Sequence, residues 1–129
     1  MISIIIRTKN EERWIGHCLK NIFKQSYDDF EVIIVDNEST DGTLKKAEKF
    51  PVNIVSIKNY RPGRSLNYGI KNSRGEILVF LSGHCIPVDD FWLKNLITEF
   101  DDNEVAAVYG RQKPMSFSSP QTKRDLLIT

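Results

Sequence analysis

The sequence predicts one α/β domain, Rossmann-like, with a mostly parallel sheet flanked by helices. Short runs of β-branched and other apolar residues alternate with longer segments whose apolar residues recur at helical spacing. The short runs are apolar throughout, as strands covered on both faces are. The chain has 129 residues, which is enough for one core and too few for two domains of usual size.

The apolar runs predict five strands. Each run is short and bounded by polar or turn-forming residues, which distinguishes it from a buried helix. The expected strands are residues 2–7, 32–35, 53–57, 77–81 and 105–109.

Four helices are expected between these strands, at residues 12–25, 43–50, 64–73 and 91–100. Ile15, Leu19 and Ile22 illustrate the pattern, because they fall on one helical face. We expect Ser39, Thr40 or Asp41 to cap the second helix, and Asp89 or Asp90 to cap the fourth. Beyond residue 110 the signals are weak, and partial disorder is expected.

Composition excludes several classes of protein. The 18 basic and 17 acidic residues leave a net charge of +1, so there is no electrostatic case for nucleic-acid binding. No apolar run approaches the roughly 20 residues of a membrane span, and the N-terminus is typical of a strand rather than a signal peptide. Cys18 and Cys85 are interpreted as reduced thiols, which favours a cytoplasmic location.

Ligands of open parallel sheets bind outside the carboxyl ends of the strands. The residues at those ends are therefore the candidates for a binding site, and most of them are polar. They are residues 7–10, 36–38, 59–64, 82–84 and 110–112.

Two of these strand ends allow alternative interpretations. Asp36 could accept hydrogen bonds from a base or a ribose, or from the amides of the loop that follows it. Thr8 and Asn10 could line a base pocket, with Arg7 facing a phosphate. The alternative for Asn10 is a cap of the first helix, and for Glu12 a favourable place in that helix's first turn.

Residues Arg61 and Arg64 flank the start of a helix, an arrangement that suits an anion but is also common among solvated arginines. His84, at a strand tip, could ligate Mn²⁺ or Zn²⁺, donate to a diphosphate, act as an acid or base, or be structural. A glycine-rich dinucleotide fingerprint, a phosphate loop and a nucleophile elbow are all absent from the sequence.

Three motifs, in order, resemble family 2 inverting nucleotide-sugar glycosyltransferases of the GT-A fold. They are SIIIRTKNEERWIGHCLKNIFKQSYDDFEVIIVDNESTDGT at 3–43, GRSLNYGIKNSRGEILVFL at 63–81, and the CIP and DDFWL runs after it. The resemblance covers residues 2–110, and it implies that 1–110 form a nucleotide-sugar-binding domain. Residues 111–129 would then be a tail leading to a missing acceptor-binding half.

The resemblance also implies roles for individual residues. Thr8, Asn10 and Glu12 would line the nucleotide cleft, and Asp36 would contact the base or ribose. Arg64 would lie near the base or diphosphate, with Asn67 supporting the same helix.

The family's Asp-x-Asp motif, whose last acid binds a divalent metal, is replaced in this sequence. Ser82 stands at the first acid and His84 at the metal-binding one. An imidazole can still ligate Mn²⁺, but the loss of two negative charges should lower the affinity for hard cations such as Mg²⁺. We expect Mn²⁺ or Mg²⁺ as the cofactor, with His84 as its ligand.

A run of Gly-Arg-Gln-x-Pro at residues 110–114 resembles bacterial polysaccharide rhamnosyltransferases. It implies that Arg111 and Gln112 face the donor or acceptor, and it suggests a deoxythymidine-diphosphate-rhamnose donor. The expected partners are a nucleoside diphosphate sugar and a glycan or lipid-linked acceptor, the latter allowing peripheral binding to the inner membrane face.

Inverting transfer needs a carboxylate base, and Asp125 is the only acid beyond Gly110. The base is therefore expected to be absent, and the chain to be part of a longer enzyme or a short protein that binds donor without efficient transfer. The alternatives are a non-catalytic nucleotide-sugar-binding or interaction module, and a remnant that binds nothing. An uncovered sheet edge should also favour self-association.

Overall fold

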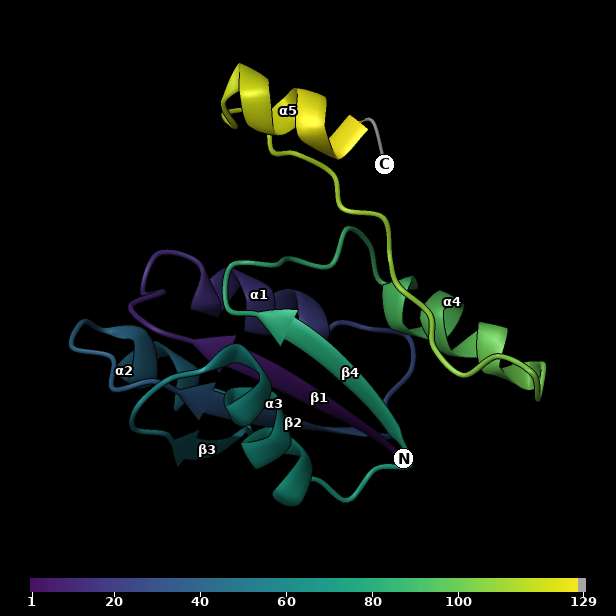
Figure 1. The fold of residues 1–129 in the computed structure, drawn as a ribbon, viewed down its shortest axis with the longest axis horizontal. Helices are drawn as coiled ribbons and strands as arrows, with labels where there is room; N and C mark the ends of the chain where they lie inside the picture. The colour runs from purple at the N-terminus through teal and green to yellow at the C-terminus, as the bar shows by residue number, and fades with distance from the viewer. Residues whose placement is uncertain (128–129) are drawn as a thin grey trace. The chain divides into compact units, whose positions relative to one another are not determined.

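The computed structural model describes residues 1–127. Its sheet consists of four parallel strands: β1 (Ile2–Thr8), β2 (Phe30–Asp36), β3 (Asn53–Ser56) and β4 (Ile77–Ser82). They lie in the order β3-β2-β1-β4. The chain therefore moves outward from β1 to β3 and then crosses back, so that β4 lies on the other side of β1. Figure 1 shows β1 at the centre of the sheet. The predicted mostly parallel α/β architecture is confirmed.

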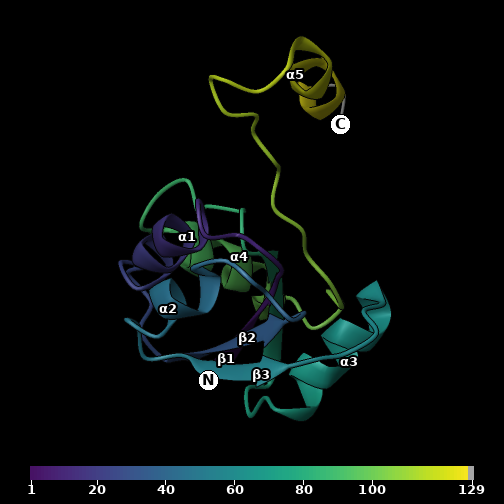
Figure 2. The same cartoon turned by 90° about the vertical axis from the view of Figure 1, so that its left-hand side faces the viewer.

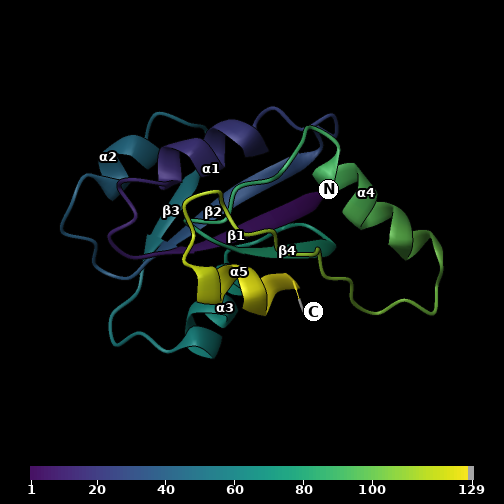
Figure 3. The same cartoon turned by 90° about the horizontal axis from the view of Figure 1, so that it is seen from above.

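Helices cover both faces of this sheet. The helices α1 (Ile15–Ile22) and α2 (Thr43–Ala47) lie on one face, and α3 (Pro62–Lys71) lies on the other (Figures 2 and 3). The α1 helix begins later than the predicted residue 12, because residues 12–14 form a turn in which Trp14 N–H bonds to the Glu11 carbonyl.

The core consists mainly of the isoleucines of β1 and β2. Ile5, Ile33 and Val35 form a cluster with Ile57 on one face. The α3 helix packs closely there: a Cβ added to Gly69 would lie 2.4 Å from a methyl carbon of Ile5. Alternate strand residues point to the opposite face, and the buried α1 residues pack on that side. This two-sided burial explains why the middle positions of β1 and β2 are apolar on both faces.

A partly buried polar cluster joins the amino-terminal ends of the strands. Glu31 on β2 accepts hydrogen bonds from the Ser3 hydroxyl at 2.7 Å and from the Arg74 amide at 2.6 Å. The Arg74 guanidinium also pairs with it, at 2.9 Å. Burial by itself would raise the pKa of Glu31, but these hydrogen bonds and the Arg74 charge together hold it below its ordinary value.

The chain divides into two compact units, Met1–Lys94 and Asn95–Thr129. The helix α4 (Trp92–Thr98) spans that division and continues as the short 3₁₀ helix Glu99–Asp101. The Asp89 carboxylate accepts from the Phe91 amide at 2.9 Å, in a turn that precedes the helix.

The strand predicted at 105–109 is wrong for the described residues, where that segment has no regular structure. An apolar run becomes a strand only when a neighbouring strand takes up its backbone hydrogen bonds, and here no strand pairs with this segment. Tyr109 is 94% exposed. The division of function proposed between 1–110 and 111–129 stays a prediction.

The tail contains a helix, α5 (Pro120–Leu127), in a segment where the sequence carries weak signals and partial disorder had been expected. Its start follows capping rules: the Ser119 hydroxyl accepts from the Thr122 amide at 3.1 Å, and Pro120 occupies the first helical position.

Candidate functional site

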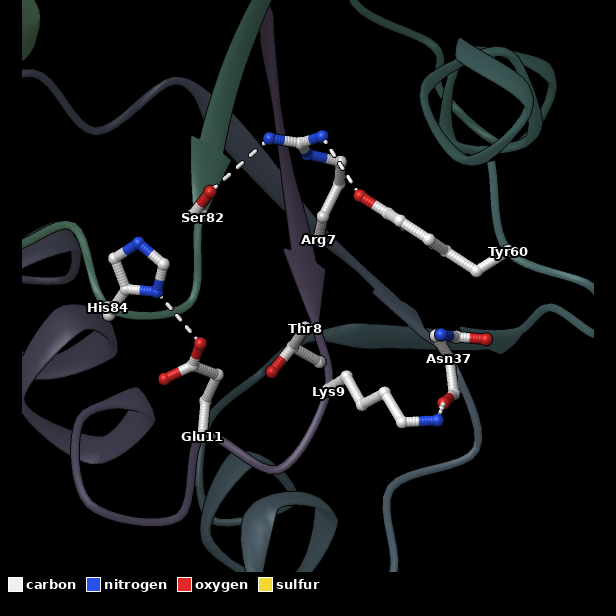
Figure 4. A pocket seen from close by; sticks show the side chains of 8 residues that line it. All are labelled: Arg7, Thr8, Lys9, Glu11, Asn37, Tyr60, Ser82 and His84. Carbon is white, nitrogen blue, oxygen red and sulfur yellow. Dashed lines mark hydrogen bonds and ion pairs between the residues drawn. The ribbon is translucent and has the colours of Figure 1, made fainter. Parts of the chain in front are cut away.

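A polar pocket of about 230 Å³ lies at the carboxyl ends of β1 and β4. Figure 4 shows its lining side chains, which come from the ends of β1, β2 and β4 and from the loop after β3. They are Arg7, Thr8, Lys9, Glu11, Asn37, Tyr60, Ser82 and His84.

The sheet register brings these residues together. Arg7 lies opposite Ser82 across the β1–β4 pair, and Thr8 lies opposite Asp36 across the β1–β2 pair. The Gly83 amide bonds to the Arg7 carbonyl at 2.9 Å, which holds the tip of β4 against β1. Because the strands are parallel, their polar ends meet at one edge.

Two cationic side chains line this pocket. The Arg7 guanidinium donates to the Tyr60 hydroxyl at 3.2 Å and to the Ser82 hydroxyl at 3.4 Å (Figure 4). Lys9 donates from Nζ to the Asn37 carbonyl at 3.1 Å. Neither cation is paired with a carboxylate in these contacts, so both can attract an anionic ligand.

The Thr8 hydroxyl is a buried polar group without a partner. Thr8 is 5% exposed, and its Oγ1 has no hydrogen bond in the part of the chain that is described. Buried polar atoms are normally hydrogen-bonded, so an unpaired hydroxyl on a pocket residue is a candidate partner for a ligand or a water.

The β4 tip is fixed by a contact between His84 and Glu11. The imidazole Nδ1 lies 2.8 Å from Glu11 Oε1, with side-chain exposures of 57% for His84 and 21% for Glu11. Gly83 permits this arrangement, since a Cβ there would come within 2.9 Å of Thr8 Oγ1 and 3.2 Å of Glu11 Cγ.

Asp36 organises the loop after β2. It is 1% exposed, and its carboxylate accepts from the Ser39 amide at 2.9 Å and from the Ser39 hydroxyl at 2.6 Å. These are the loop contacts that the sequence left as an alternative to base or ribose binding. The nucleotide role of Asp36 stays a prediction.

Asn10 and Glu12 hold the same loop from the β1 side. Asn10 Oδ1 accepts from the Thr40 amide at 2.8 Å, and Glu12 Oε2 accepts from the Gly42 amide at 3.0 Å. Asn10 therefore bonds to a distant loop instead of capping the first helix. Their predicted place in the nucleotide cleft remains a prediction, and neither residue lines the pocket.

Asp41 belongs to this loop as well. Hydrogen bonds from the Thr43 hydroxyl and amide, with one from the Glu12 amide, keep the pKa of the Asp41 carboxyl below its ordinary value. An ionised Asp41 thus precedes α2, although Gly42 occupies the capping position.

Backbone strain collects at the same edge. Among the described residues, three that are not glycine adopt positive φ: Asn10 (52°), Glu38 (53°) and Asn59 (55°). They follow β1, β2 and β3, and such conformations cluster at ligand sites.

Other predicted residues lie elsewhere. Arg64 and Asn67 line a separate open pocket of about 410 Å³ on α3, together with Tyr68 and Lys71. Arg111 belongs to the second unit and is exposed, as is Gln112. The structure therefore brings Thr8, Ser82 and His84 together, but not Arg64.

Four pocket residues had no assigned role in the sequence, although all but Glu11 fell within the strand-end ranges: Lys9, Glu11, Asn37 and Tyr60. Tyr60 fell within the polar set after the third strand, so the strand-end rule could have found it. Glu11 has no comparable signal, because only the folded chain distinguishes it from the neighbouring Glu12.

Cys18 is inert, since burial and the nearby Cys85 raise its pKa to about 12.

The model of the family described as Glycosyl transferase family 2 matches residues 3–127 of this chain. This chain belongs to glycosyl transferase family 2. The resemblance inferred from the three motifs is therefore confirmed.

Members of family 2 resemble this chain in sequence and structure. A dolichyl N-acetyl-alpha-D-glucosaminyl phosphate 3-beta-D-2,3-diacetamido-2,3-dideoxy-beta-D-glucuronosyltransferase of Methanococcus voltae is 38% identical over 106 residues, covering 75% of this chain and 33% of that protein. The O-antigen chain rhamnosyltransferase RfbN of Salmonella typhimurium is 30% identical over 123 residues, 92% of this chain and 39% of that protein.

A mannosyltransferase of Pyrobaculum calidifontis, solved with GDP-Man and Mn²⁺, is 29% identical with a TM-score of 0.74, over 98% of this chain and 38% of that one. The predicted GT-A fold is thus confirmed. The chain spans between 33% and 39% of the length of these three proteins.

Two features are absent from the described residues. They include no group of three or more His, Cys, Asp and Glu side chains able to hold a metal ion. None of the helices in that part of the chain has the length and apolarity needed to cross a bilayer.

Proposed function

We propose that this chain is the donor-binding part of an inverting glycosyltransferase. The reaction would transfer a sugar from a nucleoside diphosphate sugar to a glycan or lipid-linked acceptor in polysaccharide biosynthesis. The observation that carries the proposal is the pocket at the edge of β1 and β4, where an unpaired Thr8 hydroxyl lies beside two cations.

The cations suit the diphosphate of the donor. Arg7 is oriented by Tyr60 and Ser82, and Lys9 by the Asn37 carbonyl. Charge-assisted hydrogen bonds from such groups to phosphate oxygens are roughly twice as strong as neutral ones. The Thr8 hydroxyl would donate to an oxygen of the same ligand and so gain the partner it lacks.

Asp36 and the loop it holds would contact the nucleoside. Asp36 is almost fully buried, so in this proposal it acts on the base or ribose mainly by setting the loop, which Asn10 and Glu12 also hold. Arg64 would reach the donor from α3, and the role of Arg111 stays the prediction made from the sequence.

The residues fit a divalent cation that is shared with the donor. His84 would hold it, and phosphate oxygens and water would supply the remaining ligands, as is usual for metals bound with nucleotides. When bound, Mn²⁺ or Mg²⁺ stabilises the charge on the leaving diphosphate. Support comes from the Mn²⁺ complex of the mannosyltransferase relative and from the donor set at the β4 tip.

The chain's own residues bind and orient the donor in this scheme. A base that deprotonates the acceptor hydroxyl is still required, and the pocket carboxylate, Glu11, is already engaged with His84. We propose that the base and the acceptor site lie outside the described residues. The free thiols Cys18 and Cys85 favour the cytoplasm as the proposed location.

The rhamnosyltransferase relative favours a rhamnose donor, in keeping with the deoxythymidine-diphosphate-rhamnose that the resemblance at residues 110–114 suggests. The mannosyltransferase relative was solved with a guanosine diphosphate sugar. The decisive experiment is therefore calorimetric titration of the chain with UDP, dTDP and GDP, each with Mn²⁺ and with EDTA. We expect one nucleoside diphosphate to bind more tightly than the others.

Variants give that titration its controls. The Arg7→Ala change should weaken binding at least tenfold, whereas Lys20→Ala, on the surface of α1, should leave it unchanged. Equal weak binding of all three nucleotides, unaffected by Arg7→Ala, would contradict the proposal. Tight binding without turnover in a longer version of the protein would favour a non-catalytic nucleotide-sugar-binding module.

A further inference from the structure

The contact between His84 and Glu11 determines which imidazole nitrogen is available to a ligand. Nδ1 lies 2.8 Å from the Glu11 carboxylate. An ionised carboxylate can accept hydrogen bonds but cannot donate them. A hydrogen bond between Nδ1 and ionised Glu11 therefore requires the proton to be on Nδ1. In the neutral imidazole, Nε2 is then the nitrogen with a free lone pair.

The geometry leaves Nε2 accessible. The His84 side chain is 57% exposed, and its second ring nitrogen faces away from Glu11 (Figure 4). No hydrogen bond to this nitrogen is found within residues 1–127. Glu11 is itself held, because its amide donates to the Thr43 hydroxyl at 2.8 Å.

The rest of the β4 tip is built around this pair. Gly83 leaves space for Glu11, whose Cγ would lie 3.2 Å from a Cβ at that position. The Cys85 amide bonds to the Ser82 carbonyl at 2.9 Å, which closes the turn that carries His84. The imidazole therefore has a fixed partner and a fixed backbone.

We propose that Glu11 is a positioning residue for a metal site at the β4 tip: it holds His84 in the Nδ1–H tautomer and presents Nε2 to a divalent cation of borderline softness. This inference rests on the proposed function, because the cation would be shared with the donor diphosphate. Carboxylate–histidine–metal arrangements of this kind raise the basicity of the imidazole and orient its ring.

The arrangement also determines metal preference. Imidazole nitrogen suits Zn²⁺, Co²⁺ and Mn²⁺ better than Mg²⁺, which prefers oxygen ligands and keeps its waters. With Ser82 and His84 in place of two acids, the tip should discriminate against Mg²⁺. We expect Mn²⁺ and Co²⁺ to bind the complex of chain and nucleoside diphosphate at least tenfold more tightly than Mg²⁺.

The first test needs neither metal nor nucleotide. Nitrogen-15 NMR of the imidazole at mildly alkaline pH reports the tautomer of the free chain directly. The wild type should show His84 protonated at Nδ1, and Glu11→Ala should shift it toward the Nε2–H form that dominates in solvent. A wild-type His84 protonated at Nε2 would overturn the proposal, whatever nucleotides the chain binds.

The second test measures metal affinity in the presence of the best-binding nucleoside diphosphate, by calorimetry with Mn²⁺ and with Mg²⁺. Glu11→Ala should weaken Mn²⁺ binding 10–100-fold, which is usual when the partner of a metal-ligating histidine is lost. Glu11→Gln keeps an oxygen acceptor and should recover part of that loss. The exposed Glu48→Gln, at the C-cap of α2, is the charge-matched control and should change nothing.

The outcomes separate the two proposals. If Glu11→Gln is as damaging as Glu11→Ala, Glu11 is a direct metal ligand and the positioning role is wrong. If nucleotide binds equally well in EDTA and His84→Ala leaves it unchanged, the metal site is wrong while the donor pocket stands. If no nucleotide binds but the Nδ1–H tautomer is present, the proposed function fails and the tautomer is purely structural.

Discussion

Thr8 and Asp36 are neighbours across two strands, yet their side chains have opposite hydrogen-bonding states. Both are buried, but the Asp36 carboxylate has two short bonds to Ser39, whereas the Thr8 hydroxyl has none within residues 1–127. A satisfied buried carboxylate stabilises the folded chain, while an unpaired hydroxyl destabilises it until a ligand arrives. These states lead to different predictions for the two residues.

For Thr8, substitution by valine should uncouple stability from binding. Thr8→Val removes an unsatisfied hydroxyl and keeps the shape, so the free energy of unfolding should stay the same or rise by up to about 1 kcal/mol. Affinity for the nucleoside diphosphate should fall several-fold. Urea denaturation and calorimetry measure the two effects, and a destabilised variant would mean that the hydroxyl already has a partner.

For Asp36, the prediction is a loss of both properties. Asp36→Asn turns one acceptor into a donor that faces the Ser39 amide or hydroxyl, which should lower the free energy of unfolding by about 1–3 kcal/mol. Nucleotide affinity should fall with it, because the loop loses its anchor. The exposed Asp28→Asn serves as control, and a stable Asp36→Asn variant with unchanged urea midpoint would contradict the assignment.

At the scale of elements, α3 depends on close approach to the sheet. A Cβ at Gly69 would lie 2.4 Å from Ile5 and 3.1 Å from Val35, so the helix can reach this depth only with glycine. Parallel strands buried on both faces leave little room to adjust, because protein interiors are packed as densely as organic crystals.

Gly69→Ala should therefore destabilise the chain, by about 1–3 kcal/mol, as overpacked core substitutions do. Gly63, in the first turn of the same helix, has no atom within 4 Å of an added Cβ, which makes Gly63→Ala a matched control. That control should be neutral or stabilising by up to about 1 kcal/mol. Equal effects of the two substitutions on thermal denaturation would show that α3 is not packed as described.

At the scale of the whole molecule, the two ends of the strands differ. The candidate site lies at their carboxyl ends, and a polar cluster lies at their amino ends. The cluster at the amino ends contains Glu31, whose pKa is held below its ordinary value by hydrogen bonds from Ser3 and Arg74 and by the Arg74 charge. A depressed folded-state pKa contributes stability that is present above the unfolded pKa of about 4.3 and is lost as pH falls through the folded value.

Glu31→Gln should accordingly lower the free energy of unfolding by about 1–3 kcal/mol at neutral pH. The difference from wild type should shrink as pH falls below about 4.3. Nucleotide affinity at neutral pH should not change, since Glu31 lies at the amino ends of the strands and the pocket lies at their carboxyl ends. Urea denaturation across the pH range checks this, and a difference that is constant with pH would refute it.

Self-association is a further prediction at this scale. In the described sheet, β4 has a strand neighbour on one side only, and its Phe80 is 43% exposed. An open edge with an exposed aromatic favours pairing between copies. We expect concentration-dependent association in sedimentation velocity, reduced by Phe80→Lys; a wild type that stays monomeric at high concentration would contradict it.

Much of this protein could be predicted from local pattern. Apolar runs such as 32–35 predicted buried parallel strands, and the strand-end rule identified Thr8, Ser82 and His84 as neighbours. These predictions succeeded because periodicity and burial are encoded residue by residue. The strand predicted at 105–109 was wrong because a strand also requires a neighbouring strand to pair with. The local pattern of residues does not encode that neighbour.

The tertiary structure alone decided how the polar residues are paired. Asn10 and Glu12 look like the start of a helix in sequence, but hydrogen bonds to a loop some 30 positions away determine their roles. Glu11 and His84 are 73 residues apart, and nothing near either residue specifies their contact. The sequence by itself determined the parallel sheet and the strand ends that form the candidate site. Only the folded chain determined which side chains at those ends are paired with one another, because hydrogen bonding is directional and depends on distances that packing sets.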